Sequence, residues 1–187
     1  EILDSAPIAS GTPYLDGIWS YCRGGAHISK GNLAAARLEL GKIWQLISLN
    51  DVDKHRVGPT PVSSILRLAA HGLSGEIKQA SGDILSAIKD YESAIAIEDR
   101  NAYIEPPDWP QPIRHYLGDA LLQAGQPRKA EEVYRKDLDW HQNNGWALFG
   151  LWQSLAAQGK SEEADETYKK FRHAWRNADT NLTRSRI

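Results

Sequence analysis

A repeat of 34 residues constrains the fold of this chain more strongly than any single motif. Five residues return at that spacing: Leu117, Leu121, Gly125, Ala130 and Tyr134 recur as Leu151, Leu155, Gly159, Ala164 and Tyr168. Repeats of this length stack on one another, because one unit alone cannot bury its apolar face. The sequence therefore predicts a stacked array of similar units.

Two further copies of the pattern lie upstream at longer spacings. One copy lies 43 residues before Gly118, Gly125, Ala130 and Tyr134, at Gly75, Gly82, Ala87 and Tyr91. The other lies 51 residues before that copy, at Gly24, Gly31, Ala36 and Leu40. The additional residues form two insertions, LNDVDKHRVGPTP and the proline-rich NAYIEPPDWPQP. We expect the first to be a loop and the second an extended connection that Tyr103 and Trp109 fix against the helices.

Helical periodicity fills the spaces between the turns. Apolar residues recur three and four positions apart, and no stretch alternates with period two, so no sheet is expected. The small residue and the alanine of each copy let two helices approach closely beside the aromatic residue, and the glycine after the first helix supplies a left-handed turn. Thr60-Pro61, Gln126-Pro127 and Ser161 predict helix starts. We expect helices near residues 14–30, 32–48, 61–81, 83–98, 111–124, 127–141, 145–158 and 161–177.

The predicted fold is all-α, a right-handed α-solenoid of about four antiparallel helix pairs in a single domain over residues 1–187. The expected repeats cover 14–48, 61–99, 111–144 and 145–178, with insertions at 49–60 and 100–110 and a C-terminal tail at 179–187.

Composition excludes several classes of function. The 22 basic and 24 acidic residues give a net charge of -2, which provides no positive field for nucleic acid or anionic lipid. No apolar run approaches the roughly 20 residues that cross a bilayer. Cys22 is the one cysteine, so an internal disulfide and a cysteine-based zinc site are excluded. Because the sequence has no methionine, even at position 1, we expect it to start inside a longer gene product or after a processed segment.

These recurring residues resemble the tetratricopeptide repeat (TPR) proteins. The stretches IEPPDWPQPIRHYLGDALLQAGQPRKAEEVYRKDL, NNGWALFGLWQSLAAQGKSEEA and FRHAWRNAD are more similar to the C-terminal half of a group of bacterial TPR proteins of unsettled function. The resemblance implies a repeat fold and a binding role. The lack of a long apolar run predicts a soluble chain. Its location is unknown from the sequence: the bacterial cytoplasm is expected, and an exported location is left open. That group carries an HMPxH stretch that this sequence lacks, so a metal or catalytic role seated there does not transfer.

The first helix of each pair would line the inner face of such a solenoid. Nine candidate binding residues follow from the register, with Ile28 beside the first: Tyr21, Glu76, Gln79, His115, Asp119, Gln123, Trp146, Phe149 and Gln153. These aromatic, acidic and amide groups suit a peptide with apolar anchors and a few donors or a basic residue. A solvated helix face is the alternative. A carboxylate clamp of the chaperone-binding type is not expected, because Glu76, His115 and Asp119 stand where the clamp uses basic and amide groups.

Other reactive residues have simpler interpretations. None of the six histidines lies three or four residues from another, so no metal site is expected. His115 and Asp119 lie one helical turn apart, which favours a surface hydrogen bond over catalysis. Cys22 beside Arg23 is either an activated thiol or, as we favour, a buried packing residue. We therefore expect no catalytic residue and no cofactor.

Three functions remain compatible with the sequence. The leading hypothesis is a non-catalytic module that binds an unidentified protein or peptide on the concave face of the solenoid. The alternative is the C-terminal repeat region of a larger enzyme or of a ligand- or metal-binding protein whose active part is N-terminal and absent here. A third hypothesis is self-association through Trp175, Leu182 and Ile187.

Overall fold

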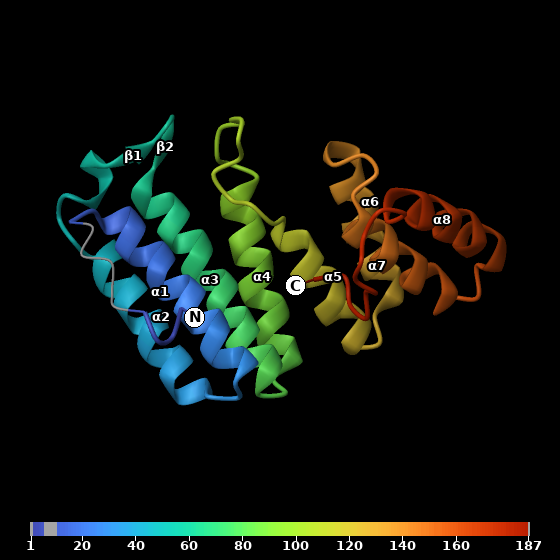
Figure 1. The fold of residues 1–187 in the computed structure, drawn as a ribbon, viewed down its shortest axis with the longest axis horizontal. Coiled ribbons are helices and arrows are strands. Elements are labelled where there is room, and N and C mark those ends of the chain that lie inside the picture. Colours follow the sequence, from blue (N-terminus) through green and yellow to red (C-terminus); the bar gives the residue numbers. More distant parts are fainter. Residues whose placement is uncertain (1, 6–10, 187) are drawn as a thin grey trace. The chain divides into compact units, whose positions relative to one another are not determined.

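Eight α-helices make up the architecture of the residues that the computed structural model describes, 2–5 and 11–186. They pack as consecutive antiparallel pairs, α1 with α2, α3 with α4, α5 with α6 and α7 with α8 (Figure 1). The all-α prediction is confirmed, and every predicted helix is present with its ends within three residues of the expected positions. Their bounds are α1 (Pro13–Ser29), α2 (Leu33–Ile47), α3 (Val62–Ala80), α4 (Ile84–Glu98), α5 (Ile113–Gln123), α6 (Pro127–Trp140), α7 (Gly145–Ala156) and α8 (Ser161–Ala174).

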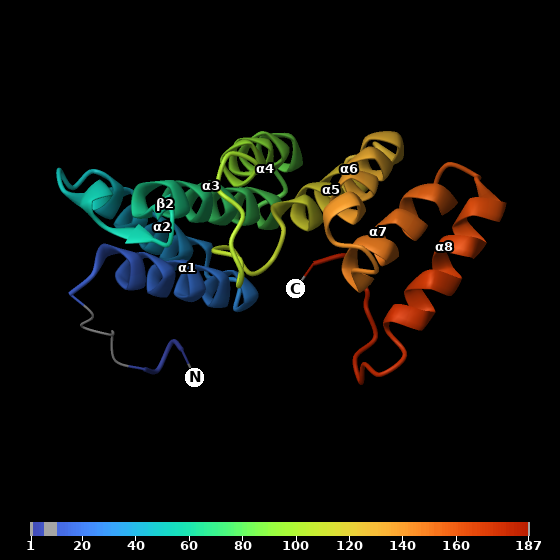
Figure 2. The ribbon, with the colours of Figure 1, turned by 90° about the horizontal axis from the view of Figure 1, so that it is seen from above.

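The chain divides into two compact units at the end of the proline-rich connection. Unit 1 comprises Glu1–Pro110 and contains α1 to α4; unit 2 comprises Gln111–Ile187 and contains α5 to α8. Within each unit the helices lie side by side (Figure 2). Within the described residues, every helix is too short or too polar to traverse a lipid bilayer.

Close approach of the helices depends on glycine in both units. A Cβ atom on Gly75 of α3 would overlap the ring of Tyr91 from α4, and in unit 2 a Cβ on Gly118 or Gly150 would overlap the ring of Tyr134. Both tyrosines are fully buried. The steric role predicted for the small residue and the aromatic residue of the repeat is therefore confirmed at these positions.

Turn and capping residues explain where the helices begin. Gly31, Gly82, Gly125 and Gly159 follow the first helix of each pair and all have positive φ, as predicted. Asn32, Asp83 and Asn144 accept hydrogen bonds from the backbone N–H three residues ahead. Helices α6 and α8 begin at the predicted residues, whereas α3 begins at Val62, one residue after the predicted proline.

The first insertion contains a structure that was not predicted from the sequence. A 3-10 turn, η1 (Val52–Lys54), leads into a hairpin of two short antiparallel strands, β1 (Arg56–Val57) and β2 (Thr60–Pro61). The expectation of a loop without a sheet is wrong here, because Gly58 with positive φ turns the chain tightly enough for two residues on each side to pair. Val52 is buried in the unit 1 core and Val57 packs against it.

The proline-rich connection is fixed by one of its two predicted aromatic anchors. Trp109 is buried and makes an edge contact with Tyr21, with ring centroids 4.9 Å apart. Tyr103 is 78% exposed, so its predicted anchoring role is wrong. Four prolines prevent a helix here, and the buried Trp109 ring packs the extended connection against α1.

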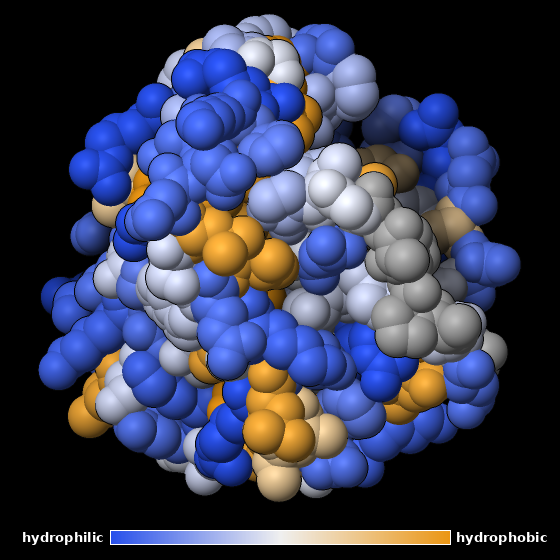
Figure 3. All heavy atoms as spheres, turned by 90° about the vertical axis from the view of Figure 1, so that its left-hand side faces the viewer, coloured by the Kyte–Doolittle hydropathy of each residue, from blue (hydrophilic) through white to orange (hydrophobic). Residues whose placement is uncertain are grey.

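Exposed apolar residues in unit 1 are dispersed. On the side that carries α2 and the hairpin, hydrophobic atoms form separate patches divided by hydrophilic ones (Figure 3). Leu38 and Trp44 of α2 are among the exposed large hydrophobic residues. This side therefore does not present one continuous apolar surface. Single exposed apolar side chains are common on proteins and do not indicate a binding site.

Candidate functional site

The three predicted binding residues of unit 1 make contacts within the helix packing. The Tyr21 hydroxyl donates to Glu76 Oε1 at 3.3 Å, and the Tyr91 hydroxyl donates to Gln79 Oε1 at 2.8 Å. Glu76 and Gln79 are both buried, and Trp109 covers the Tyr21 ring. These polar groups therefore join helices within unit 1, and the ring of Trp109 packs against the predicted binding residue Tyr21.

His115 forms a different pair from the one predicted in unit 2. It is 1% exposed, and its Nε2 lies 3.0 Å from Oδ2 of Asp137 on α6. Asp137 also pairs with His141, Oδ1 to Nδ1 at 3.0 Å. The predicted surface hydrogen bond between His115 and Asp119 is thus wrong, because His115 is directed into the α5–α6 interface. Because a carboxylate can only accept hydrogen bonds, His115 donates its Nε2–H to Asp137. The buried Nδ1 of His115 has no hydrogen-bond partner among the described residues.

The Asp119 carboxylate pairs with two arginines that lie near the end of the described residues. It is 6% exposed, and Arg184 donates to both carboxylate oxygens, Nε to Oδ1 at 3.2 Å and Nη2 to Oδ2 at 2.6 Å. Arg186 Nε donates to Oδ2 at 3.3 Å, and Gln123 Nε2 donates to the same oxygen at 3.3 Å. A carboxylate this deeply buried is stable when it is paired and hydrogen-bonded in this way.

The residue between the two arginines enters the same site. Ser185 is 0% exposed; its hydroxyl hydrogen-bonds the Tyr134 hydroxyl and donates to the His115 carbonyl oxygen at 3.2 Å. Burial raises the pKa of Tyr134 far above its usual range, so the phenol stays neutral. The Arg186 guanidinium lies 5.4 Å from the centre of the Tyr116 ring, within range of a cation–π contact.

We call this surface of unit 2 the α5 face, and define it as Tyr116, Asp119 and Gln123 with the His115 carbonyl oxygen and the Tyr134 hydroxyl. The structure brings predicted residues His115, Asp119 and Gln123 together here. Segment 184–186 and Tyr134 were not predicted as parts of the site. The sequence did contain one indication of this contact: Arg184 and Arg186 are basic, and the predicted inner face carries the acidic Asp119.

Two of the three remaining predicted residues, Trp146 and Phe149 on α7, belong to an aromatic cluster. Trp146 contacts Trp175 edge-on at 4.8 Å, and Phe149 is buried against Phe171 at 5.3 Å. Gln153 lines a cavity of about 560 Å³ that Leu182 also lines. Trp146 and Phe149 therefore hold α7 to α8.

The residues proposed for self-association are also placed within unit 2. Trp175 Nε1 donates to the Thr180 carbonyl oxygen at 2.6 Å, and Leu182 packs against the buried cluster of Leu148, Phe149 and Phe171. Ile187 lies outside the described residues. Self-association remains a prediction, and two of its three candidate side chains contribute to packing within unit 2.

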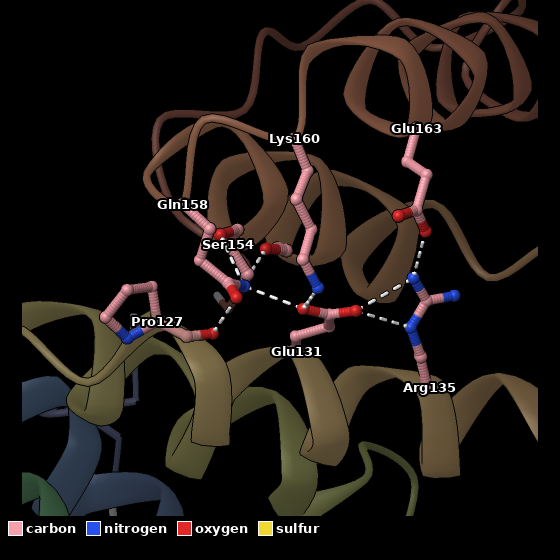
Figure 4. A network of polar contacts seen from close by, with 8 residues as sticks. Pro127, Glu131, Arg135, Ser154, Gln158, Lys160 and Glu163 are labelled. Atoms are coloured by element: carbon pink, nitrogen blue, oxygen red, sulfur yellow. Dashed lines mark hydrogen bonds and ion pairs between the residues drawn. The ribbon is translucent and has the colours of Figure 1, made fainter.

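A second polar network lies between α6 and the turn that precedes α8 (Figure 4). Glu131 accepts hydrogen bonds from Arg135 at 2.9 Å and from Gln158 and Lys160 at 2.7 Å each, and Arg135 also reaches Glu163. Burial opposes ionisation of Glu131, but these donors outweigh it and lower its pKa to about 2. Because each cation is matched by a carboxylate, we interpret this network as a structural link within unit 2.

The surroundings of Cys22 differ from those expected from the sequence. Cys22 is exposed, so its expected role as a buried packing residue is wrong. Desolvation by its surroundings raises the pKa of the thiol, and the neighbouring Arg23 is directed to Glu39, Nε to Oε1 at 3.1 Å. Among the residues that the structure describes, no group of three or more His, Cys, Asp and Glu side chains is arranged to hold a metal ion.

Comparison with known proteins supports the TPR-like fold. No protein-family model and no curated protein sequence gives a significant match to the chain. Two crystal structures from Podosopora anserina are similar in structure: a protein classed with kinesin light chains that has nearly identical TPR-like repeats, and a variant of it with one glutamine replaced by methionine. The first has a TM-score of 0.60 at 18% identity and covers 92% of this chain and 81% of its own. The second has a TM-score of 0.59 at 18% identity, with 90% and 78% covered. These likenesses, with the helix pairs described above, show that the chain is a TPR-like repeat protein in its fold.

Proposed function

We propose that this chain is a non-catalytic protein-interaction module and that the α5 face of unit 2 is its peptide-binding surface. TPR-like repeats are stacked units that present helix faces to a partner, so the fold supports a binding role. The fold leaves open which face binds, and the polar contacts of unit 2 support the α5 face.

One observation carries this assignment: a stretch of polypeptide without regular secondary structure already lies against the α5 face. Three successive residues of segment 184–186 each make a side-chain contact there: Arg184 with Asp119, Ser185 with Tyr134, and Arg186 with Asp119 and Tyr116. A face that accepts consecutive side chains from a non-helical segment has the properties of a peptide-binding surface.

Electrostatics supports the same surface. A buried carboxylate destabilises a protein unless a cation and hydrogen-bond donors compensate it. If segment 184–186 left the face, the Asp119 carboxylate would lose the positive charge that Arg184 and Arg186 bring to it. The α5 face is therefore suited to a partner that supplies a cationic side chain.

Site-specific cross-linking tests this proposal. A photoreactive amino acid placed at Gln123, whose side chain is exposed, should cross-link a partner in the source cell, and Asp119→Asn should abolish that product. Exposed Lys169 on α8 is the matched position for the photoreactive group, and Lys169→Ala with Lys170→Ala is the matched variant. Equal cross-linking from positions 123 and 169, or a product insensitive to Asp119→Asn, would contradict assignment of the partner site to the α5 face.

A further inference from the structure

We infer that segment 184–186 is an internal pseudo-ligand of the α5 face, and that the peptide which replaces it contains arginine, a small hydroxyl residue and a second arginine in succession. This inference rests on the proposed function and adds to it the chemical class of the ligand and a competing segment in the same chain. Three properties of the segment carry it: its charged contacts, its central hydroxyl and its attachment through side chains. Competition with a free ligand is the consequence that can be tested.

The charged contacts favour arginine over lysine. Arg184 engages Asp119 with two nitrogens, one on each carboxylate oxygen. This paired geometry requires the planar guanidinium, because a lysine ammonium is a single point donor. Arg186 adds a second donor to Oδ2 and places its guanidinium over the Tyr116 ring, a stacking contact that also favours arginine.

The residue between the arginines needs a hydroxyl. The Ser185 hydroxyl is enclosed between the Tyr134 hydroxyl and the His115 carbonyl oxygen, so it can donate to the carbonyl and accept from the phenol. A side chain without a hydroxyl would leave the buried phenol unpaired. A phosphorylated serine would bring about two negative charges close to the Asp119 carboxylate into a fully buried position, and should be rejected.

The segment is held mainly by side chains. Among the described residues, 179–185 make no backbone–backbone hydrogen bond. The Arg184 side chain is 40% exposed, so water competes for its ion pair. The attachments of this stretch to the helices include the Trp175 bond to Thr180, the packing of Leu182 and the contacts of residues 184–186. Such a segment can be displaced without unfolding any helix.

A tethered segment competes strongly with a free ligand. A ligand on the same chain has an effective concentration in the millimolar range, so it reduces the apparent affinity of a free peptide that uses the same contacts. Removing the two arginine side chains from the chain should vacate the face while leaving Asp119, Tyr116 and Tyr134 in place. The free peptide then binds without this competition.

Fluorescence anisotropy with a labelled amidated peptide of sequence NLTRSR tests the inference. The titrated proteins are the unmodified full chain, the double variant Arg184→Ala with Arg186→Ala, and that double variant with Asp119→Asn. We expect the double variant to bind the peptide about tenfold more tightly than the unmodified chain, and Asp119→Asn to weaken that binding about tenfold or more. Replacing both peptide arginines by lysine, or phosphorylating its serine, should each weaken binding about tenfold or more.

The outcomes separate the inference from the proposed function. Equal peptide binding by the unmodified chain and the double variant would overturn the pseudo-ligand. Equal binding of the arginine and lysine peptides would overturn the arginine preference, and undiminished binding of the phosphopeptide would overturn the role of the buried hydroxyl. Absence of binding to every protein would overturn the inference, yet the proposed function would survive if the cross-link from position 123 still required Asp119. Circular dichroism and thermal unfolding show that each variant is folded.

Discussion

The guanidinium of Arg184 engages both carboxylate oxygens of Asp119, although the two residues are 65 positions apart in the chain. Asp119 lies on α5, the first helix of the third pair, and the repeat register predicts that it lies on the inner face. The side chain that meets it belongs to the same chain. The α5 face is therefore in an occupied state, and its occupant indicates the chemistry that it accepts.

Asp119→Asn should loosen segment 184–186. Asparagine keeps the size of the side chain and removes the charge that holds two arginines, so the free energy of unfolding of unit 2 should fall by about 1–2 kcal/mol. Limited proteolysis with trypsin, read by mass spectrometry, should show faster cleavage after Arg184 and Arg186. Glu163→Gln, a charge change on α8 that leaves the α5 face intact, is the control, and an unchanged cleavage rate in Asp119→Asn would contradict the prediction.

Gly75→Ala should destabilise unit 1, because the added methyl group would overlap the buried Tyr91 ring. Overpacking of this kind decreases stability by about 1–3 kcal/mol. Gly41→Ala is the matched control: Gly41 lies within α2 and no atom is within 4 Å of its added Cβ, so alanine should stabilise by about 0.5–1 kcal/mol through its helix propensity. Urea unfolding measures both. If Gly75→Ala and Gly41→Ala changed the free energy of unfolding in the same direction, contact with Tyr91 would not determine the role of Gly75.

The periodic part of the molecule could be predicted from the sequence because its determinants are local or repeat at fixed intervals. Gly75, Tyr91, Gly118 and Tyr134 each occupy the structural place that the repeat assigns them. The Arg184–Asp119 pair follows no such interval, since an ion pair between distant residues leaves no period in the chain. For the same reason His115 was paired with its neighbour one turn away, when its partner is Asp137 on the adjoining helix.

The short hairpin was missed for a different reason. Strands of two residues are too short to show an alternating pattern, and the insertion contains polar and proline residues that also occur in loops. In the candidate site, the helical register placed residues on the inner face but gave no information on what covers them. Trp109 and segment 184–186 cover Tyr21 and Asp119, respectively, and both arrive from irregular parts of the chain.

The charge of Glu131 should make the stability of unit 2 depend on pH between about 4.3 and 2. Its pKa in the folded chain is about 2, below the value of about 4.3 for an unfolded chain. A depressed pKa means that the stabilisation is fully present above about pH 4.3 and is lost as the pH falls toward 2. Glu131→Gln should therefore lower the free energy of unfolding by about 1–2 kcal/mol at pH 7, with a difference from the unmodified chain that shrinks between about pH 4.3 and 2.

Thermal unfolding across that pH range checks this prediction. Glu166→Gln on α8 is a suitable control, because Glu166 is exposed and differs from the residues that contact Glu131 and Arg135 in the network described above. The control should show no comparable pH-dependent difference from the unmodified chain. A Glu131→Gln effect that stayed constant down to about pH 2 would show that the ionised carboxylate is not the source of the stabilisation.

A double-mutant cycle between protein and peptide tests the central claim most directly. In the chain that carries Arg184→Ala and Arg186→Ala, affinities are measured with Asp or Asn at position 119, and with arginine or its neutral analogue citrulline at the first arginine of the NLTRSR peptide. If the α5 face binds a peptide arginine through Asp119, the two changes should be coupled by about 1–3 kcal/mol. Additive effects, with a coupling energy near zero, would contradict direct contact between Asp119 and the peptide arginine, and with it the claim that the α5 face binds an arginine-containing peptide through Asp119.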